Sequence, residues 1–157
     1  MDEKSLMHFL ARAKQKCYAS ETREHRVQPF FKGSKQMEYS EGTYRYVDAY
    51  FGEVRFSGIE AVYSGNTPVW SMTYSGGILP GSDYGMAGDI FRFLKAALRE
   101  PDLNCPVRGP PEFSRNGFAY TSSFSGGFWD FTGSEKILHR EDEVYSLHFS
   151  GGRIVIS

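Results

Sequence analysis

The chain has 157 residues, with 18 basic and 19 acidic side chains and a net charge of −1. This length suits a single domain, residues 1–157, that buries its own core. The balanced charge predicts no direct binding of nucleic acid. Aromatic residues make up 16% of the chain, a surplus that is typical of strands or of a ligand cleft.

Two isolated cysteines, Cys17 and Cys105, lack the spacing of a disulfide module or of a zinc site. The charged N-terminal sequence does not have the pattern of a signal peptide, and no apolar run reaches the roughly 20 residues of a membrane span. We therefore expect a cytoplasmic protein that binds no metal, no cofactor and no membrane. The sequence does not indicate an oligomeric state.

A helix is predicted near the N-terminus, because apolar residues there follow the i, i+3, i+4, i+7 spacing of one buried face: Leu6, Phe9, Leu10 and Ala13. The stretch "GTYRYVDAYFG" is then predicted to be a strand in which one carboxylate and three tyrosines share a face: Tyr44, Tyr46, Asp48 and Tyr50. This face is either a recognition wall for a planar or cationic ligand or a solvated strand face, and both interpretations stay open.

The stretch from Phe56 to Gly77 predicts two further strands. Alternation places Glu60 on an inward face, beside Phe56 and Val62. A buried glutamate must find a cation, backbone donors, a raised pKa or a water-filled cleft. In the next strand, alternation predicts that Trp70 belongs to the core, although a tryptophan near a strand start also suits the wall of a pocket.

The same order of elements recurs in the second half of the chain. A second helix is predicted from Ile90, Phe93, Leu94 and Ala97, and the proline-rich loop "VRGPP" follows it with Arg108. Residues 131–152 then match residues 56–77 without a gap, with Glu135 at the position of Glu60. We infer an α+β fold made by internal duplication of a helix-plus-strands unit, about residues 1–79 and 80–157, with two helices packed on an antiparallel sheet.

Six segments in this order, "YRYVDAYFG", "FSGIEAVY", "PVWSMTYSG", "FLKAAL", "VRGP" and "VYSLHFSGG", together resemble an uncharacterised bacterial domain family. Its members occur alone or C-terminal to a repressor-like helix-turn-helix, and no function is assigned to them. The resemblance starts at about Phe9, which leaves too few residues for a helix-turn-helix. It implies a sensor-like module without its own DNA-binding part.

The candidate ligand-binding residues are Tyr46, Asp48, Tyr50, Glu60, Trp70, Arg108 and Glu135. For Glu60 and Glu135 the alternatives are a structural carboxylate that fixes a loop, a ligand-binding group in a cleft, or a pair for acid–base catalysis. Arg108 is able to pair with a ligand carboxylate or with Glu60, and the internal ion pair is favoured.

The leading hypothesis is a small-molecule-binding, sensor-like domain, which predicts a specific ligand and no turnover. A small enzyme that uses Glu60, Glu135 or Asp48 is the second hypothesis, and it predicts a strongly shifted pKa in an open cleft. A protein–protein adaptor is the third, and it predicts a flat exposed aromatic patch without a deep pocket.

Overall fold

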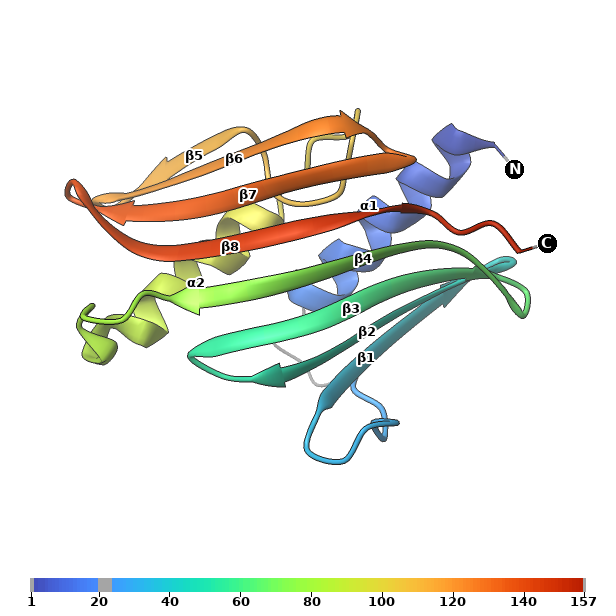
Figure 1. The fold of residues 1–157 in the computed structure, drawn as a ribbon, viewed down its shortest axis with the longest axis horizontal. Coiled ribbons are helices and arrows are strands. Elements are labelled where there is room, and N and C mark those ends of the chain that lie inside the picture. Colours follow the sequence, from blue (N-terminus) through green and yellow to red (C-terminus); the bar gives the residue numbers. More distant parts are fainter. Residues whose placement is uncertain (1, 20–23, 157) are drawn as a thin grey trace.

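A computed structural model describes residues 2–19 and 24–156 of the chain (Figure 1). The first half contains helix α1 and four strands: α1 (Glu3–Ala19), β1 (Lys35–Glu41), β2 (Tyr44–Gly52), β3 (Arg55–Ser64) and β4 (Thr67–Ile78). The second half contains a short 3-10 turn, helix α2 and four strands: η1 (Tyr84–Met86), α2 (Ala87–Leu98), β5 (Glu112–Arg115), β6 (Phe118–Gly127), β7 (Asp130–His139) and β8 (Asp142–Arg153).

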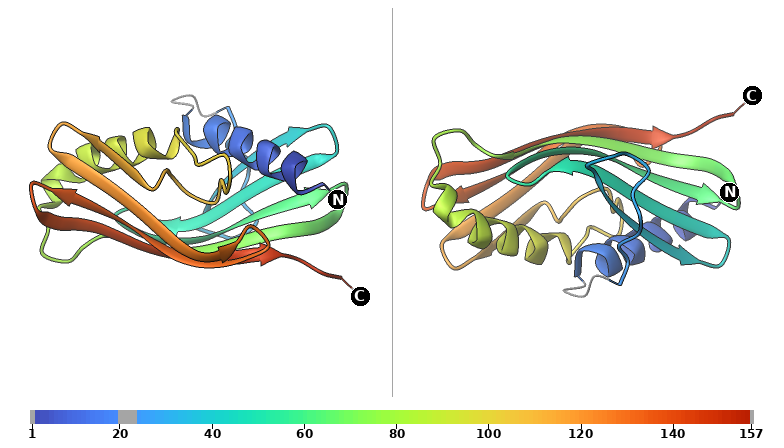
Figure 2. Two further views of the ribbon diagram at one scale, coloured as in Figure 1. Left: turned by 90° about the horizontal axis from the view of Figure 1, so that it is seen from above. Right: turned by 90° about the horizontal axis from the view of Figure 1, so that it is seen from below.

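The eight strands form one antiparallel sheet with the order β1-β2-β3-β4-β8-β7-β6-β5. Each half therefore contributes four neighbouring strands, and β4 joins β8 at the centre of the sheet. The predicted α+β class is confirmed. The sheet curves, and both helices lie on its concave face (Figure 2).

The two helices bury the faces that the sequence pattern predicts. In α1 the four predicted residues, from Leu6 to Ala13, are at most 1% exposed, and in α2 Ile90 and Ala97 are completely buried. The ring of Phe9 packs on Tyr39 and Tyr44 of the first half, and that of Phe93 packs on Phe113 and Phe118 of the second. Each helix therefore covers strands of its own half.

Two glycines allow the close approach of β4 and β8. A Cβ atom on Gly76 would lie 2.5 Å from Cα of Leu147, and one on Gly151 would lie 2.7 Å from Cα of Met72. Because these contacts are with backbone atoms, only glycine fits at either position. The two four-stranded halves consequently share one continuous hydrophobic core.

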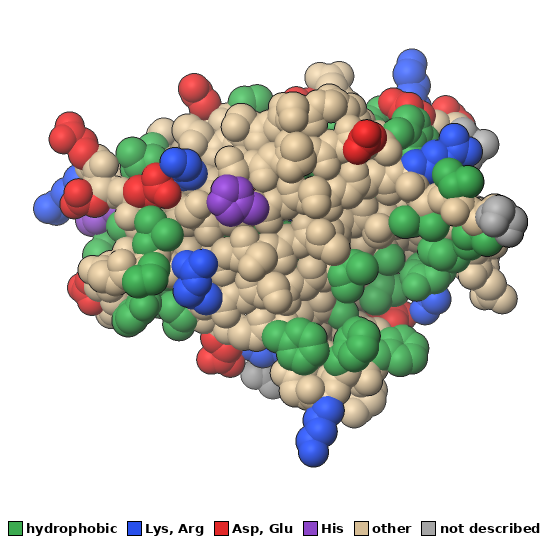
Figure 3. Space-filling view, viewed as in Figure 1, with side chains coloured by type: hydrophobic (Ala, Val, Ile, Leu, Met, Phe, Trp, Pro, Cys, Tyr) green, Lys and Arg blue, Asp and Glu red, His purple; other side chains and the backbone are tan. Residues whose placement is uncertain are grey.

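The outer face of the sheet is largely polar and uncharged at its centre (Figure 3). Small hydroxyl side chains alternate outward there, among them Thr73, Ser75, Thr132 and Ser150, and all four are exposed. A group of exposed aromatic residues lies away from this centre. The ring centres of Phe31 and Phe51 are 6.1 Å apart, and Phe30 is 84% exposed. The concave face, in contrast, carries the buried charges.

Candidate functional site

Two carboxyl groups lie side by side under α1. Asp48 of β2 and Glu60 of β3 are direct cross-strand partners on the concave face, and both side chains are completely buried. The hydroxyl group of Tyr18 from α1 lies between them, 3.2 Å from Oδ2 of Asp48 and 3.0 Å from Oε1 of Glu60. One hydroxyl hydrogen serves two acceptors, so the two carboxyl groups are coupled through Tyr18.

Glu60 has a cationic partner, whereas over residues 2–19 and 24–156 no cation pairs with Asp48. Nζ of Lys14 lies 2.7 Å from Oε2 of Glu60 and also donates to the backbone oxygen of Val107. The second donor to Asp48 is the neutral hydroxyl of Tyr74, 2.6 Å from Oδ1. The charge of Glu60 is therefore balanced by an ion pair, while Asp48 is held by hydroxyl groups.

Burial, reinforced by the neighbouring charge of Glu60, raises the pKa of Asp48 to about 7. The hydrogen bonds from Tyr74 and Tyr18 and the charge of Lys14 oppose this rise. A protonated Asp48 can donate to the oxygen of Tyr18, which leaves the Tyr18 hydrogen for Glu60. Asp48 thus changes its charge near neutral pH.

The second half has a closed ion pair instead. Arg108, in the segment between α2 and β5, donates from Nε and Nη2 to the two oxygens of Glu135 at 2.9 and 2.5 Å. Tyr120 and Tyr145 donate to the same carboxylate at 2.6 and 2.8 Å. Burial by itself would raise the pKa of Glu135, but the charge and hydrogen bonds of Arg108 hold it below its ordinary value.

Arg108 also contacts the first half of the protein. Its guanidinium group lies 5.8 Å from the ring centre of Tyr74, whose hydroxyl donates to Asp48. The segment that carries it runs between the two helices on the concave face (Figure 2). We refer to Lys14, Asp48, Glu60, Arg108 and Glu135 as the buried ionic network, since each side chain in it is at most 4% exposed.

Gly58 makes room for Tyr74. A Cβ atom at position 58 would lie 2.5 Å from the Tyr74 hydroxyl and 2.7 Å from the backbone oxygen of Ala49. The missing side chain lets Tyr74 cross over β3 and reach the carboxyl group of Asp48 on β2. The glycine that precedes Glu60 in the sequence pattern therefore has a steric role.

A cavity of about 540 Å³ adjoins the network on its Asp48 side. Asp48, Tyr18, Tyr74 and Arg108 form its polar part. Its apolar walls come from strands of the first half and from α2 and include Met37, Phe56, Phe91, Leu94 and Leu98. Cavities with apolar walls and a few converging polar groups are typical of small-molecule sites.

Cys17 also lines this cavity. Burial, together with the charges of Asp48 and Glu60, raises the pKa of its thiol to about 12. The thiol stays protonated at neutral pH and is not activated as a nucleophile. Both cysteines are free, as the sequence predicts.

The structure brings together three of the seven predicted site residues around the cavity, namely Asp48, Tyr50 and Arg108. Glu60 and Glu135 lie behind them as partners of Lys14 and Arg108. The solvated-face alternative for the Asp48 strand is wrong, because Tyr46 and Asp48 are completely buried. The suggested pairing of Arg108 with Glu60 is also wrong, because helix α1 supplies the cation of Glu60.

Trp70 and Tyr46 belong to the core, and neither lines the cavity. The Trp70 ring stacks on Phe128 and Phe131, and its Nε1 donates to the backbone oxygen of Phe128 at 3.1 Å. Among the described residues, the Tyr46 hydroxyl has no hydrogen-bond partner. Its structural counterpart Tyr120 donates to Glu135, so the two halves differ at this point.

The sequence interpretation missed Lys14 and Tyr18. Both continue the buried stripe of α1, since Lys14 follows Leu10 by four residues and Tyr18 follows Lys14 by four. A lysine inside an apolar stripe indicates a buried cation with a carboxylate partner. That signal was present in the sequence.

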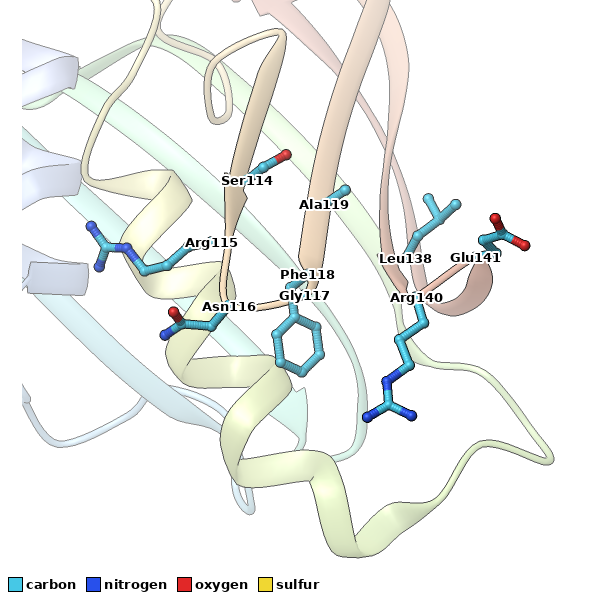
Figure 4. A pocket seen from close by; sticks show the side chains of 9 residues that line it. All are labelled: Ser114, Arg115, Asn116, Gly117, Phe118, Ala119, Leu138, Arg140 and Glu141. Carbon is cyan, nitrogen blue, oxygen red and sulfur yellow. The ribbon is translucent and has the colours of Figure 1, made fainter.

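A second hollow of about 560 Å³ lies in the second half, beside the β5–β6 turn and the β7–β8 turn (Figure 4). Arg115 and Arg140 border it, and their side chains extend in different directions. It lacks the converging polar groups of a binding site.

Over residues 2–19 and 24–156, no cluster of three or more His, Cys, Asp or Glu side chains suits a metal ion. In that part of the chain, neither helix has the length and apolar character required to cross a bilayer.

The sequence comparison identifies a family for this chain. A family model described as Domain of unknown function (DUF5680) matches residues 48–154, which is more than half of the chain. The chain belongs to this family. The DUF5680 match begins at Asp48 and includes Glu60, Arg108 and Glu135, whereas α1, with Lys14 and Tyr18, precedes it. Neither the curated proteins nor the solved structures contain a match to this chain.

Proposed function

We propose that this chain is a cytosolic small-molecule-binding domain of the sensor type. The observation that carries the proposal is the cavity of about 540 Å³ with the buried carboxyl group of Asp48 in its wall. A carboxyl group that titrates near neutral pH and whose hydrogen-bond partners in the described part of the chain are hydroxyl groups is well suited to hold a ligand donor. The role of a sensor follows the family resemblance, which implies that related domains occur alone or C-terminal to a repressor-like helix-turn-helix.

The difference between the halves supports a binding site in the first half. We infer that the halves arose by internal duplication, because Glu60 and Glu135 occupy corresponding positions opposite Met72 and Leu147. In the second half, Arg108 and two tyrosines satisfy Glu135. In the first half, Asp48 stands beside Glu60 and faces the cavity, so the candidate ligand-binding carboxyl group belongs to this copy, while α2 and Arg108 of the second half complete the cavity wall.

An enzyme is the second candidate, and one observation favours it. Asp48 has a pKa of about 7 and lies beside a second carboxyl group, the arrangement that acid–base catalysis requires. Binding explains the site better, because the second carboxyl group, Glu60, is paired with Lys14 and does not line the cavity. The adaptor hypothesis expects no deep pocket, which disfavours it here.

A thermal-shift screen against a broad set of metabolites tests the proposed function. A ligand at about 100 times its Kd adds roughly 2.7 kcal/mol to the free energy of unfolding, which raises the melting temperature by several degrees. Gly88→Leu is the test variant, since Gly88 lines the cavity and a Cβ atom there meets no atom within 4 Å. The leucine side chain should narrow the cavity and abolish the ligand-induced shift.

Gly127→Leu is the matched control, because Gly127 lies at the end of β6 and its Cβ position is also free of neighbours within 4 Å. This variant should respond to the ligand like the unchanged protein. A screen without any stabilising compound, or a ligand that stabilises Gly88→Leu equally, would contradict a binding site in this cavity. Turnover of a stabilising compound would instead support the enzyme.

A further inference from the structure

The charges of the buried ionic network do not balance. It contains three carboxyl groups and two cations, and the two cations are already paired: Lys14 with Glu60 at 2.7 Å and Arg108 with Glu135 at 2.5 Å. Asp48 is the carboxyl group left over, with hydrogen bonds from the neutral hydroxyls of Tyr18 and Tyr74. Because an unpaired buried carboxylate is costly, an ionised Asp48 would be stabilised by one more positive charge.

In the part of the chain that the structure describes, the cavity is the side from which such a charge would approach Asp48. Asp48 lines the cavity, whereas Glu60 and Glu135 do not. On its other sides Asp48 is surrounded by α1, β3 and β4, which supply Tyr18, Glu60 and Tyr74. A neutralising group on a bound molecule would therefore approach Asp48 from the cavity.

The cavity walls also suit a cation with an apolar body. Several aromatic side chains line it, namely Tyr18, Tyr50, Phe56, Tyr74 and Phe91. Two of these rings already have a cation near them, since Lys35 lies 5.8 Å from the ring centre of Tyr50 and Arg108 lies 5.8 Å from that of Tyr74. Aromatic faces attract ammonium groups and also bury the apolar part of a ligand.

The other basic groups that line the cavity do not cancel this preference. Arg26 and Lys95 are exposed to solvent, and Lys35 pairs with Glu53 at 3.0 Å. His25 is half-buried, and its ring centre lies 5.7 Å from that of Tyr39. Solvent and salt screen exposed charges strongly, but they screen the buried carboxylate of Asp48 much less. The inner end of the cavity consequently favours a positive group.

We propose that the cavity binds a small primary amine with an aromatic or apolar body, and that its ammonium group donates to the carboxylate of Asp48. This assignment rests on the proposed function and specifies the class of its ligand. It makes Asp48 the residue that selects an amine over an alcohol of the same shape. A charged hydrogen bond in a buried site provides that selection.

Matched pairs of amines and alcohols test the assignment: tryptamine with tryptophol, tyramine with tyrosol, and hexylamine with hexanol. Their dissociation constants are measured by calorimetry at pH 8. Asp48 is ionised there because burial and Glu60 raise its pKa only to about 7, and an alkyl amine such as that of lysine is protonated because its pKa is about 10.4. In at least one pair, the amine should bind at least tenfold more tightly than the alcohol.

Asp48→Asn should weaken binding of that amine at least tenfold and leave the alcohol nearly unchanged, because the amide keeps the shape but lacks the charge. Asp142→Asn removes the same charge at an exposed position, the first residue of β8, and should leave both affinities unchanged. Melting curves establish that each variant is folded.

Alcohols that bind as tightly as their amines would overturn the assignment while leaving a binding cavity in place. Amines that bind Asp48→Asn as tightly as the unchanged protein would overturn it as well. If no pair binds, the amine class is excluded, and a non-amine ligand in the metabolite screen would still support the proposed function. The two proposals therefore fail in distinguishable ways.

Discussion

At the residue scale, Asp48 combines complete burial with a position beside a second acid. The charged and titratable groups packed around it come from four parts of the fold: Lys14, Cys17 and Tyr18 of α1, Glu60 of β3, Tyr74 of β4, and Arg108 of the segment after α2. Because folding raises its pKa, the folded protein holds the Asp48 proton more tightly than the unfolded chain does.

The pH dependence of stability follows from this shift. Between the ordinary aspartate pKa of about 3.9 and the folded value of about 7, Asp48 makes the free energy of unfolding fall as the pH rises, by up to about 1.4 kcal/mol per pH unit. Asp48→Asn removes this contribution. We expect the variant to gain stability relative to the unchanged protein as the pH is raised from 4 to 8.

Urea denaturation of both proteins at several pH values measures this difference. Subtracting the free energy of unfolding of the unchanged protein from that of the variant removes the contribution of other groups. One of these is Glu135, whose lowered pKa makes the free energy of unfolding rise with pH below about pH 4.5. A difference in the free energy of unfolding that stays constant from pH 4 to 8 would show that the pKa of Asp48 is not raised.

At the element scale, one ion pair attaches the segment after α2 to the second half of the sheet. Arg108→Met should lower the free energy of unfolding by about 3–5 kcal/mol, because it leaves Glu135 buried and without a cation. Adding Glu135→Gln should recover part of this loss, since the amide carries no charge. Urea denaturation measures the free energy of unfolding of the single and the double variant.

The pair formed by Lys136 and Glu143 provides the control. It has a similar separation, 2.9 Å, but its side chains are 48% and 36% exposed. Lys136→Met should therefore cost at most about 1 kcal/mol. Equal losses for Arg108→Met and Lys136→Met would mean that burial does not determine the strength of these pairs.

Helix α1 contributes more than a hydrophobic cover. It lies before the DUF5680 match, yet it supplies Lys14 and Tyr18 to the carboxyl groups of Asp48 and Glu60. Without that helix, both carboxyl groups would lose the hydrogen bonds of Tyr18, and Glu60 would also lose its ion pair with Lys14. The residues before position 48 thus complete the site that the matched region begins.

At the scale of the whole molecule, the two halves share one sheet and one core. The Trp70 ring of the first half stacks on Phe128 and Phe131 of the second, and glycines let β4 and β8 pack closely. We therefore expect the halves to unfold together in a single transition.

Two single-tryptophan variants test this cooperativity. Trp129→Phe leaves Trp70 in the first half as the fluorescent probe, and Trp70→Phe leaves Trp129 in the second. Within each variant, the denaturation curve followed by fluorescence should coincide with the one followed by circular dichroism, with one midpoint. Separate midpoints would indicate that the halves are independent folding units.

The sequence by itself determined the features that depend on local periodicity. The spacing of Leu6 and Phe9 fixed the buried face of α1, and strand alternation placed Glu60 and Glu135 inward. These patterns are local because helix and strand geometry repeats every few residues. They identify which side chains are buried, but they do not identify the partners of those side chains.

Only the tertiary structure decided which charges meet. Lys14 reaches Glu60 because α1 crosses the first-half strands, and Arg108 reaches Glu135 because its segment runs between the helices. The cavity beside Asp48 likewise forms where the two helices and the strands of the first half come together. These partners are far apart in the chain, and the packing of whole elements, which no local repeat encodes, brings them within hydrogen-bond distance.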